Sequence, residues 1–277
     1  MGKTTNEGFE ASVNWNKQLT RDLAVDFRGS FTYNRTILNE KDEPNYPYVW
    51  RTAKNKPLQS TMGYVSLGLF ESDEEVANSP DQSYFGGRVQ AGDIKYQDVN
   101  GDGVINDNDQ VMISPYGSIP RMQFGLGMNI VYKKWDIGVF FNGTAQRTIL
   151  MTSGGDVPVD IFPFTTPQSQ TFSQLLQFVA DDHWSLENPN PAAKFPRLGI
   201  VYGDYKNNHQ PSTYWKRNGN YFRFKTFELG YTFPNVRVYF SGDNLAVWSP
   251  FKHWDPALWW NQYPMSRTFN IGAQVKF

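Results

Sequence analysis

Hydrophobic and polar residues alternate along much of the chain with a period of two residues. Strict alternation of this kind is typical of β-strands with one apolar and one polar face. The pattern predicts strands over residues 9–15, 23–33, 124–132, 135–141, 236–240 and 269–277. Over residues 222–233, apolar residues lie first on even positions and then on odd ones. A β-bulge near Lys225 and Thr226 would absorb that one-residue slip, and a strand buried on both faces is the alternative.

The predicted connections between these strands fall into two length classes. Short turns cover residues 16–22, 133–134 and 234–235, whereas long excursions cover residues 35–121, 147–220 and 246–265. Outer-membrane barrels have short turns at the periplasmic end and long loops at the extracellular end. A soluble sandwich does not need to sort its loops in this way. The sequence therefore predicts an all-β chain that forms a transmembrane antiparallel β-barrel with long extracellular loops.

The number of predicted strands is odd, and this bears on the extent of the barrel. Seven crossings are expected, or nine if the first excursion holds another pair, with Val65, Leu67 and Leu69 in its first strand. An odd count leaves two open edges, and each unpaired backbone group in lipid costs several kcal/mol. Bacterial barrels have even strand counts. We therefore expect residues 1–277 to be the C-terminal segment, of about 7–9 strands, of a larger barrel.

Composition excludes several other classes of protein. The chain of 277 residues has 16% aromatic residues, no cysteine and a formal net charge of −1. The near-neutral charge gives no basic surface for nucleic acid, and the lack of cysteine excludes disulfide scaffolds and thiol catalysis. No apolar run approaches the roughly 18 residues that a membrane-spanning helix needs. The three histidines are isolated in sequence, and no nucleophile–base motif is present, so we expect no enzyme.

A twelve-residue acidic loop lies in the first excursion. Oxygen-bearing side chains occupy its positions 1, 3, 5, 9 and 12, and Gly103 stands at position 6, as in a calcium-binding loop. Position 12 is aspartate rather than glutamate, which leaves Mg²⁺ as an alternative. A turn rich in aspartate and asparagine that needs no metal is the other alternative. The predicted ligands of a structural Ca²⁺ are Asp98, Asn100, Asp102, the carbonyl of Val104, Asn106 and Asp109.

Aromatic residues cluster in the last excursion, between residues 248 and 263. One interpretation is a belt at the membrane interface. The other is a platform on which sugar rings stack. Because they lie in the middle of the excursion, Trp254, Trp259 and Trp260 are the candidates for ligand contact.

Several segments resemble those of a known family. Residues 92–105, with the sequence GDIKYQDVNGDGVI, are similar to a segment that recurs in the SusC/RagA family of TonB-linked outer-membrane transporters. Further similar segments follow in family order and cover almost the whole chain. They are residues 63–70, 183–198, 221–234, 241–245 and 263–277.

The resemblance implies a function that the strand pattern alone does not. Members of the family form barrels of 22 strands that import glycans, and sometimes oligopeptides, across the outer membrane. They act with a SusD-like surface lipoprotein as a lid and draw energy from the TonB complex. The resemblance implies that the signal peptide, the plug and the earlier strands lie outside residues 1–277. The alternative hypothesis is a secreted, calcium-dependent carbohydrate-binding β-sandwich.

Overall fold

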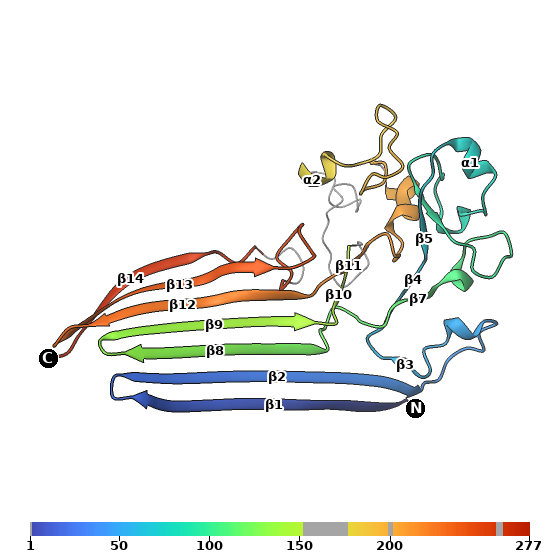
Figure 1. Cartoon of the computed structure of the whole chain (residues 1–277). Coiled ribbons are helices and arrows are strands. Elements are labelled where there is room, and N and C mark those ends of the chain that lie inside the picture. Colours follow the sequence, from blue (N-terminus) through green and yellow to red (C-terminus); the bar gives the residue numbers. More distant parts are fainter. Residues whose placement is uncertain (1, 152–176, 199–201, 259–262) are drawn as a thin grey trace.

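Seven long strands form one antiparallel sheet, which we call the wall (Figure 1). The computed structural model describes residues 2–151, 177–198, 202–258 and 263–277. The strands follow one another in the sheet in chain order, so that each pairs with its neighbour in sequence among the wall strands. They are β1 (Lys3–Thr20), β2 (Leu23–Glu40), β8 (Met122–Tyr132), β9 (Trp135–Ala145), β12 (Tyr221–Thr232), β13 (Val236–Trp248) and β14 (Thr268–Val275).

The two ends of the wall differ as the sequence predicts. Short turns join β1 to β2, β8 to β9 and β12 to β13 at one end, and the long excursions all leave from the other end (Figure 1). The chain begins at the end with the long excursions, and its last residues lie at the end with the short turns (Figure 1). A two-residue strand, β3 (Lys56–Pro57), pairs with Ile37 and Leu38 near the end of β2.

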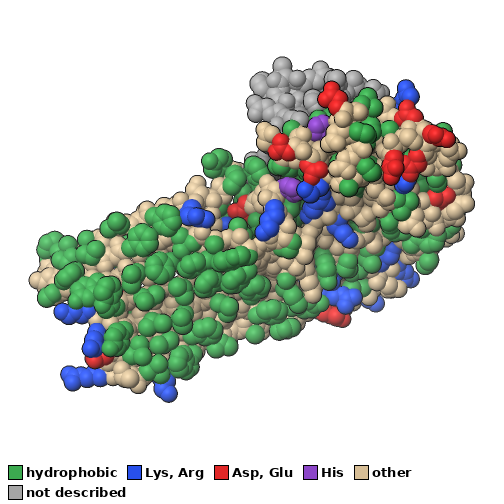
Figure 2. Space-filling model, turned by 45° about the horizontal axis from the view of Figure 1, so that its top comes forward, with side chains coloured by type: hydrophobic (Ala, Val, Ile, Leu, Met, Phe, Trp, Pro, Cys, Tyr) green, Lys and Arg blue, Asp and Glu red, His purple; other side chains and the backbone are tan. Residues whose placement is uncertain are grey.

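Strand register places the apolar residues of all seven strands on one face of the wall. Leu126 of β8, for example, lies opposite Phe141 of β9. Many of these side chains are exposed, with Phe9 at 59% and Ile271 at 83% of their full accessibility, whereas those of β2 and β12 are mostly half-buried. Hydrophobic side chains spread over the wall in Figure 2. The opposite face carries polar residues, as the period-two alternation requires.

A β-bulge interrupts β12 where the sequence predicts one. The register shifts between Phe224 and Thr226 in the pairing of β12 with β9 and again in its pairing with β13. One extra residue on a strand restores its apolar side chains to the same face. Phe222 and Phe227 can therefore both contribute to the apolar face of the wall, and the alternative of a strand buried on both faces is not needed.

The wall has seven strands, as the first count predicts, and the first excursion adds no further pair of long strands to it. Leu67 and Leu69 lie in β5 (Ser66–Leu69), which pairs with β6 (Ile94–Tyr96) in a separate small sheet, and Val65 directly precedes that strand. Another small sheet joins β4 (Thr61–Gly63) to β7 (Val111–Ser114). Strands of three or four residues are far shorter than the 9–11 residues that cross a bilayer.

The first two excursions fold together into what we call the loop body, which comprises residues 41–121, 147–151, 177–198 and 202–220. It includes the strands β10 (Thr148–Leu150) and β11 (Lys216–Asn218), which pair with each other. Its short helices are η1 (Val49–Arg51), α1 (Asp73–Ala77), η2 (Ser83–Phe85), η3 (Asp107–Asp109), α2 (Gln177–Ala180) and η5 (Tyr202–His209).

The loop body has its own hydrophobic core. Residues from both excursions, and Phe251 from the last one, pack together there. The largest side chains that are almost fully buried in it are Tyr64, Ile94, Tyr96, Ile105, Phe195 and Trp215. No helix in the described part of the chain has both the length and the apolar character that a membrane span needs.

The sandwich hypothesis is wrong. A sandwich buries the inner faces of two sheets against each other. The apolar face of the wall is exposed, and the other sheets among the described residues have only two strands each.

Candidate functional site at the mouth of the wall

A buried ion pair joins the wall to the last excursion, at the end of the sheet that carries the loop body. Arg223 lies on β12, one residue before Phe224, and its side chain is 1% exposed. Its Nη2 donates to the carboxylate of Asp255 at 2.5 Å, and that side chain is 8% exposed. The guanidinium also donates to the Oδ1 of Asn244 on β13. A buried arginine needs such partners, because an unpaired charge away from water is costly.

Two further side chains hold the same segment, which we call the last loop (residues 249–267). Arg147, at the start of the second excursion, donates to the carbonyl of Pro256 and, at 3.4 Å, to that of Leu258. Asn244 donates to the carbonyl of Met265 at 2.6 Å. The last loop is therefore fixed to the wall near its middle and near its end, across the mouth of the sheet.

Sequence reasoning missed these anchoring residues. Arg223 stands between two phenylalanines in a strand that reads YFRFK. An arginine at that position of an alternating strand lies on the polar face and needs a partner. The sequence contains that signal, but it does not identify Asp255, 32 residues further along, as the partner.

Of the three tryptophans that the sequence suggests as ligand contacts, the structure describes one. Trp254 is half-buried and packs against the core of the loop body. Trp259 and Trp260 lie outside the described residues. The structure brings Trp254 next to the anchored Asp255, so its position is fixed by the same contacts.

His253 lies in a cluster of aromatic rings beside Trp254. Its ring stacks on Phe178 with centroids 4.6 Å apart, and it meets Phe195 and Phe251 at 5.8 and 5.9 Å. Burial lowers the pKa of His253, and the nearby cations Arg217 and Lys194 lower it further. The imidazole is therefore held toward its neutral form, which suits a ring packed among phenylalanines.

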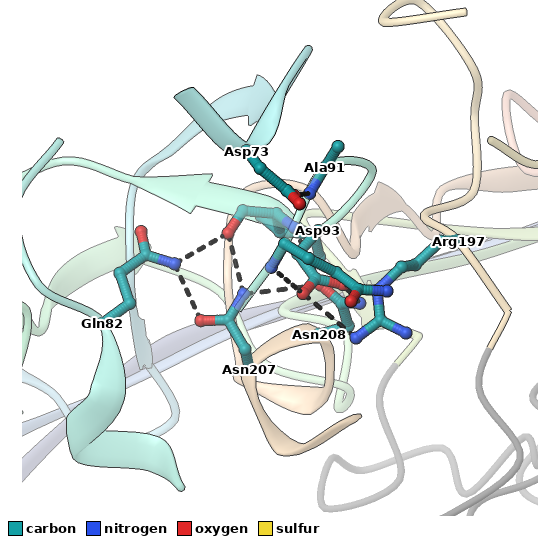
Figure 3. Close-up of polar contacts among 9 residues, drawn as sticks. Asp73, Gln82, Ala91, Asp93, Arg197, Asn207 and Asn208 are labelled. Carbon is teal, nitrogen blue, oxygen red and sulfur yellow. Dashed lines mark hydrogen bonds and ion pairs between the residues drawn. The ribbon is translucent and has the colours of Figure 1, made fainter. Parts of the chain in front are cut away.

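A buried polar network ties the first two excursions together (Figure 3). Asp93 forms an ion pair with Arg197 at 2.6 Å, and its Oδ1 accepts a hydrogen bond from Asn208 at 2.7 Å. Gln82 and Asn207 both donate to the carbonyl of Ile94, at 3.0 and 2.9 Å. Burial raises the pKa of Asp93, while Arg197 opposes the shift. The network satisfies polar groups in the core and fixes residues about 100 positions apart in sequence.

The acidic loop closes on its own backbone. Asp98 accepts from the N–H groups of Gly101 and Gly103, at 2.7 and 2.8 Å. Asp109 accepts from Val99 and Asn106, both at 2.8 Å. Within the described ranges, no group of three or more histidine, aspartate or glutamate side chains is arranged to hold a metal ion. The calcium site at Asp98–Asp109 stays a prediction.

The polar face of the wall carries its own ion pairs. Arg237 of β13 lies between Asp136 of β9 and Glu228 of β12, with its Nη2 at 2.5 Å from the glutamate and also bonded to the aspartate. These residues adjoin a hollow of about 540 Å³, whose lining also includes Arg28 and Asp243. The two faces of the wall therefore differ in chemistry along its whole width.

Two curated proteins are similar to the chain in sequence. The TonB-dependent receptor P26 of Formosa agariphila is 28% identical over 240 residues, which cover 78% of this chain and 22% of that protein. The TonB-dependent receptor SusC of Bacteroides thetaiotaomicron is 23% identical over 304 aligned residues, which cover the whole chain and 27% of that protein. No family model matches the chain. The chain thus spans about a quarter of the length of these relatives.

Solved structures of a peptide transporter are similar to the chain in fold. The structure of the RagAB peptide transporter covers the whole chain with 30% of its own length, at a TM-score of 0.64 and 17% identity. The RagAB peptide importer in its open-open state gives a TM-score of 0.62 and 19% identity, and the chain covers 29% of it. The chain therefore resembles SusC/RagA-type TonB-dependent outer-membrane proteins, and the wall has the fold of a segment of their barrel.

Proposed function

We propose that the chain supplies part of the barrel wall and of the extracellular loops of a TonB-dependent nutrient importer in the outer membrane. The observation that carries this proposal is the apolar face of the wall, which has exposed large side chains on β1, β8, β9, β13 and β14 and half-buried ones on β2 and β12. An exposed apolar surface of that extent is stable in contact with hydrocarbon and is a liability in water. The polar face and its ion pairs would then face the aqueous interior.

The cargo is an oligopeptide or a glycan. The similar structures are of a peptide transporter, which favours oligopeptides. The resemblance of the sequence to the SusC/RagA family keeps glycans as the second class. A SusD-like lipoprotein would cover the loop body as a lid, and the TonB complex would act through a part of the protein outside residues 1–277.

Trp254, Trp259 and Trp260 are the proposed ligand contacts. Arg223 and Arg147 support this by binding the last loop at Asp255 and at Pro256, directly after Trp254. A ring held in place loses little conformational freedom when a ligand stacks on it.

Uptake by cells tests the proposal. Cells that make the full-length protein should take up labelled oligopeptides or oligosaccharides, and a protonophore should stop this uptake. Cells that lack the gene should show no such uptake. A protein that remains in the soluble fraction, or uptake that is unchanged without the gene, would contradict the proposal. In the Trp254→Ala variant we expect weaker ligand binding with normal assembly into the membrane.

A further inference from the structure

A second hollow, of about 380 Å³, lies where the wall meets the loop body. Its lining comes from the end of β7, from the segment that joins β9 to β10, and from β11 and the residues after it. Arg147, Lys216 and Arg217 are all part of this lining, together with hydroxyl and amide side chains such as Ser114 and Asn218. Neither an aspartate nor a glutamate is among the residues that line it.

The three cations of this hollow bind neutral acceptors. Lys216 donates from Nζ to the carbonyl of Ile113 at 2.9 Å. Arg217 donates from Nη1 to the carbonyls of Tyr214 and of Lys216, at 2.6 and 3.1 Å. Arg147 also binds carbonyl oxygens, and its buried Nε has no partner within the part of the chain that the structure describes. Carbonyl oxygens satisfy donors but leave the positive charge in place.

Three other arginines of the protein have a different arrangement. Arg197, Arg223 and Arg237 each lie within 2.6 Å of a carboxylate oxygen. Among the described residues, none of the three cations of the hollow lies within 4 Å of a carboxylate. Asp255 faces Arg147 but is bound to Arg223. Burial lowers the pKa of Arg147 and of Arg217, because their charges have lost water, and for Arg147 the nearby Tyr221 and Asp255 offset this only in part.

We propose that this hollow is an oxyanion subsite, which binds a carboxylate or sulfate group carried by the imported ligand. The inference rests on the proposed function and adds a preference for negatively charged cargo. A planar carboxylate can accept two parallel hydrogen bonds from a guanidinium, and charge-assisted bonds of this kind are about twice as strong as neutral ones. The uncharged donors of the lining would complete the shell around the oxyanion.

Equilibrium binding to the full-length protein in detergent tests the subsite. A galacturonate trimer is compared with a galactose trimer, and an acidic tripeptide with its amide, by calorimetry. Inorganic sulfate serves as a competitor. We expect at least one charged probe to bind about tenfold or more tightly than its neutral match, since hydrogen bonds to charged groups contribute that much. The pair that shows the preference identifies the class of ligand.

Removal of the charges shows whether the hollow causes the preference. In the double variant Lys216→Gln, Arg217→Gln the preference should fall to about twofold or less. The variant Arg217→Lys, which keeps the charge, should retain part of it. The double variant Lys41→Gln, Lys54→Gln removes two exposed charges of the loop body outside the hollow and should retain all of it.

Two results would overturn the oxyanion subsite. In one, neither charged probe binds more tightly than its neutral match. In the other, the preference survives in the double variant at Lys216 and Arg217. Energy-dependent uptake of a neutral ligand alongside either result would refute this inference alone, whereas loss of all uptake would count against the proposed function.

Discussion

The wall and the loop body use hydrophobic residues in opposite ways. In the wall, large apolar side chains such as Phe9 and Ile271 point outward and are exposed. In the loop body, side chains of the same type, such as Tyr64 and Trp215, are 1% exposed and form a core. Backbone hydrogen bonds between neighbouring strands hold the wall together, whereas contacts between distant segments hold the loop body. The difference agrees with the proposed function, in which hydrocarbon covers the apolar face of the wall and water surrounds the loop body.

Truncation of a large side chain in the core of the loop body should give the largest effect. It should also show whether the loop body and the wall lose protection independently of each other. Trp215→Ala should destabilise the loop body by about 3–5 kcal/mol, because it removes a large buried side chain and leaves a cavity. Hydrogen exchange on the protein in detergent should show lost protection in the loop body and unchanged protection in the wall. Leu186→Ala, at a position that is 87% exposed, is the control. Equal loss of protection in both regions would contradict their independence.

Loss of the buried ion pair should release the last loop from the wall. Asp255→Ala leaves Arg223 buried without its counter-charge, and breaking such a pair costs about 3–5 kcal/mol. Hydrogen exchange of the backbone around residues 249–258 measures the release. The double variant Arg223→Met, Asp255→Leu should be less destabilised than either single variant, because no uncompensated charge remains. Protection that is unchanged in Asp255→Ala would show that other contacts fix the loop.

A charge on the apolar face should impair insertion, whereas a charge on the polar face should not. Leu126→Arg places a cation in the apolar face near the middle of β8, at a cost of about 2–4 kcal/mol at the bilayer midplane. Asn129→Arg, on the opposite face of the same strand, is the matched control. The folded fraction in lipid vesicles, measured over a series of urea concentrations, reports both. Similar losses in the two variants would show that the faces are wrongly assigned.

Calcium should stabilise the loop body if the acidic loop binds it. At a free concentration 100 times the Kd, a ligand that binds only the folded state adds about 2.7 kcal/mol of stability. Thermal unfolding with added Ca²⁺, with Mg²⁺ and with a chelator measures this. Asp98→Asn should weaken the response, and Asp73→Asn, outside the loop, should preserve it. Equal unfolding temperatures under all three conditions would favour the metal-free turn.

The smallest expected effect is a pH dependence at His253. Its lowered pKa means that the folded protein binds this proton less readily than the unfolded chain does. The contribution of the neutral ring is therefore complete above the ordinary histidine pKa of about 6.5 and is lost as the pH falls below it. Hydrogen exchange of the last loop at pH 7.5 and pH 5 should show loosening at the lower pH. His253→Phe should remove most of that difference, and an unchanged difference would assign it to another group.

The wall could be predicted from the sequence because its pattern is local. Alternation identifies each of the seven strands, and the slip between Phe224 and Phe227 identifies the bulge. The short strands around Leu67 were assigned to the wall as a second option because a few alternating residues do not show which sheet they join. Pairing partners of short strands depend on the surrounding fold, so this part required the structure.

The site at the mouth could be predicted only in part. The last loop was identified from its aromatic residues, and Trp254 does lie at the mouth. The anchors Arg147 and Arg223 were not identified, because their partners lie 21 to 111 residues away in sequence. The cationic hollow was missed for the same reason, since Arg147 and Arg217 are brought together only by the pairing of β10 with β11.

The sequence by itself determined which residues form strands, which face of each strand is apolar and at which end the long excursions leave. These properties follow from neighbours two residues apart, and a shift of one residue would reverse every face. Only the tertiary structure decided how the excursions pack, which charges are paired and where unpaired cations meet. Those outcomes depend on contacts between segments far apart in the chain, where each partner is selected by burial and geometry rather than by local pattern.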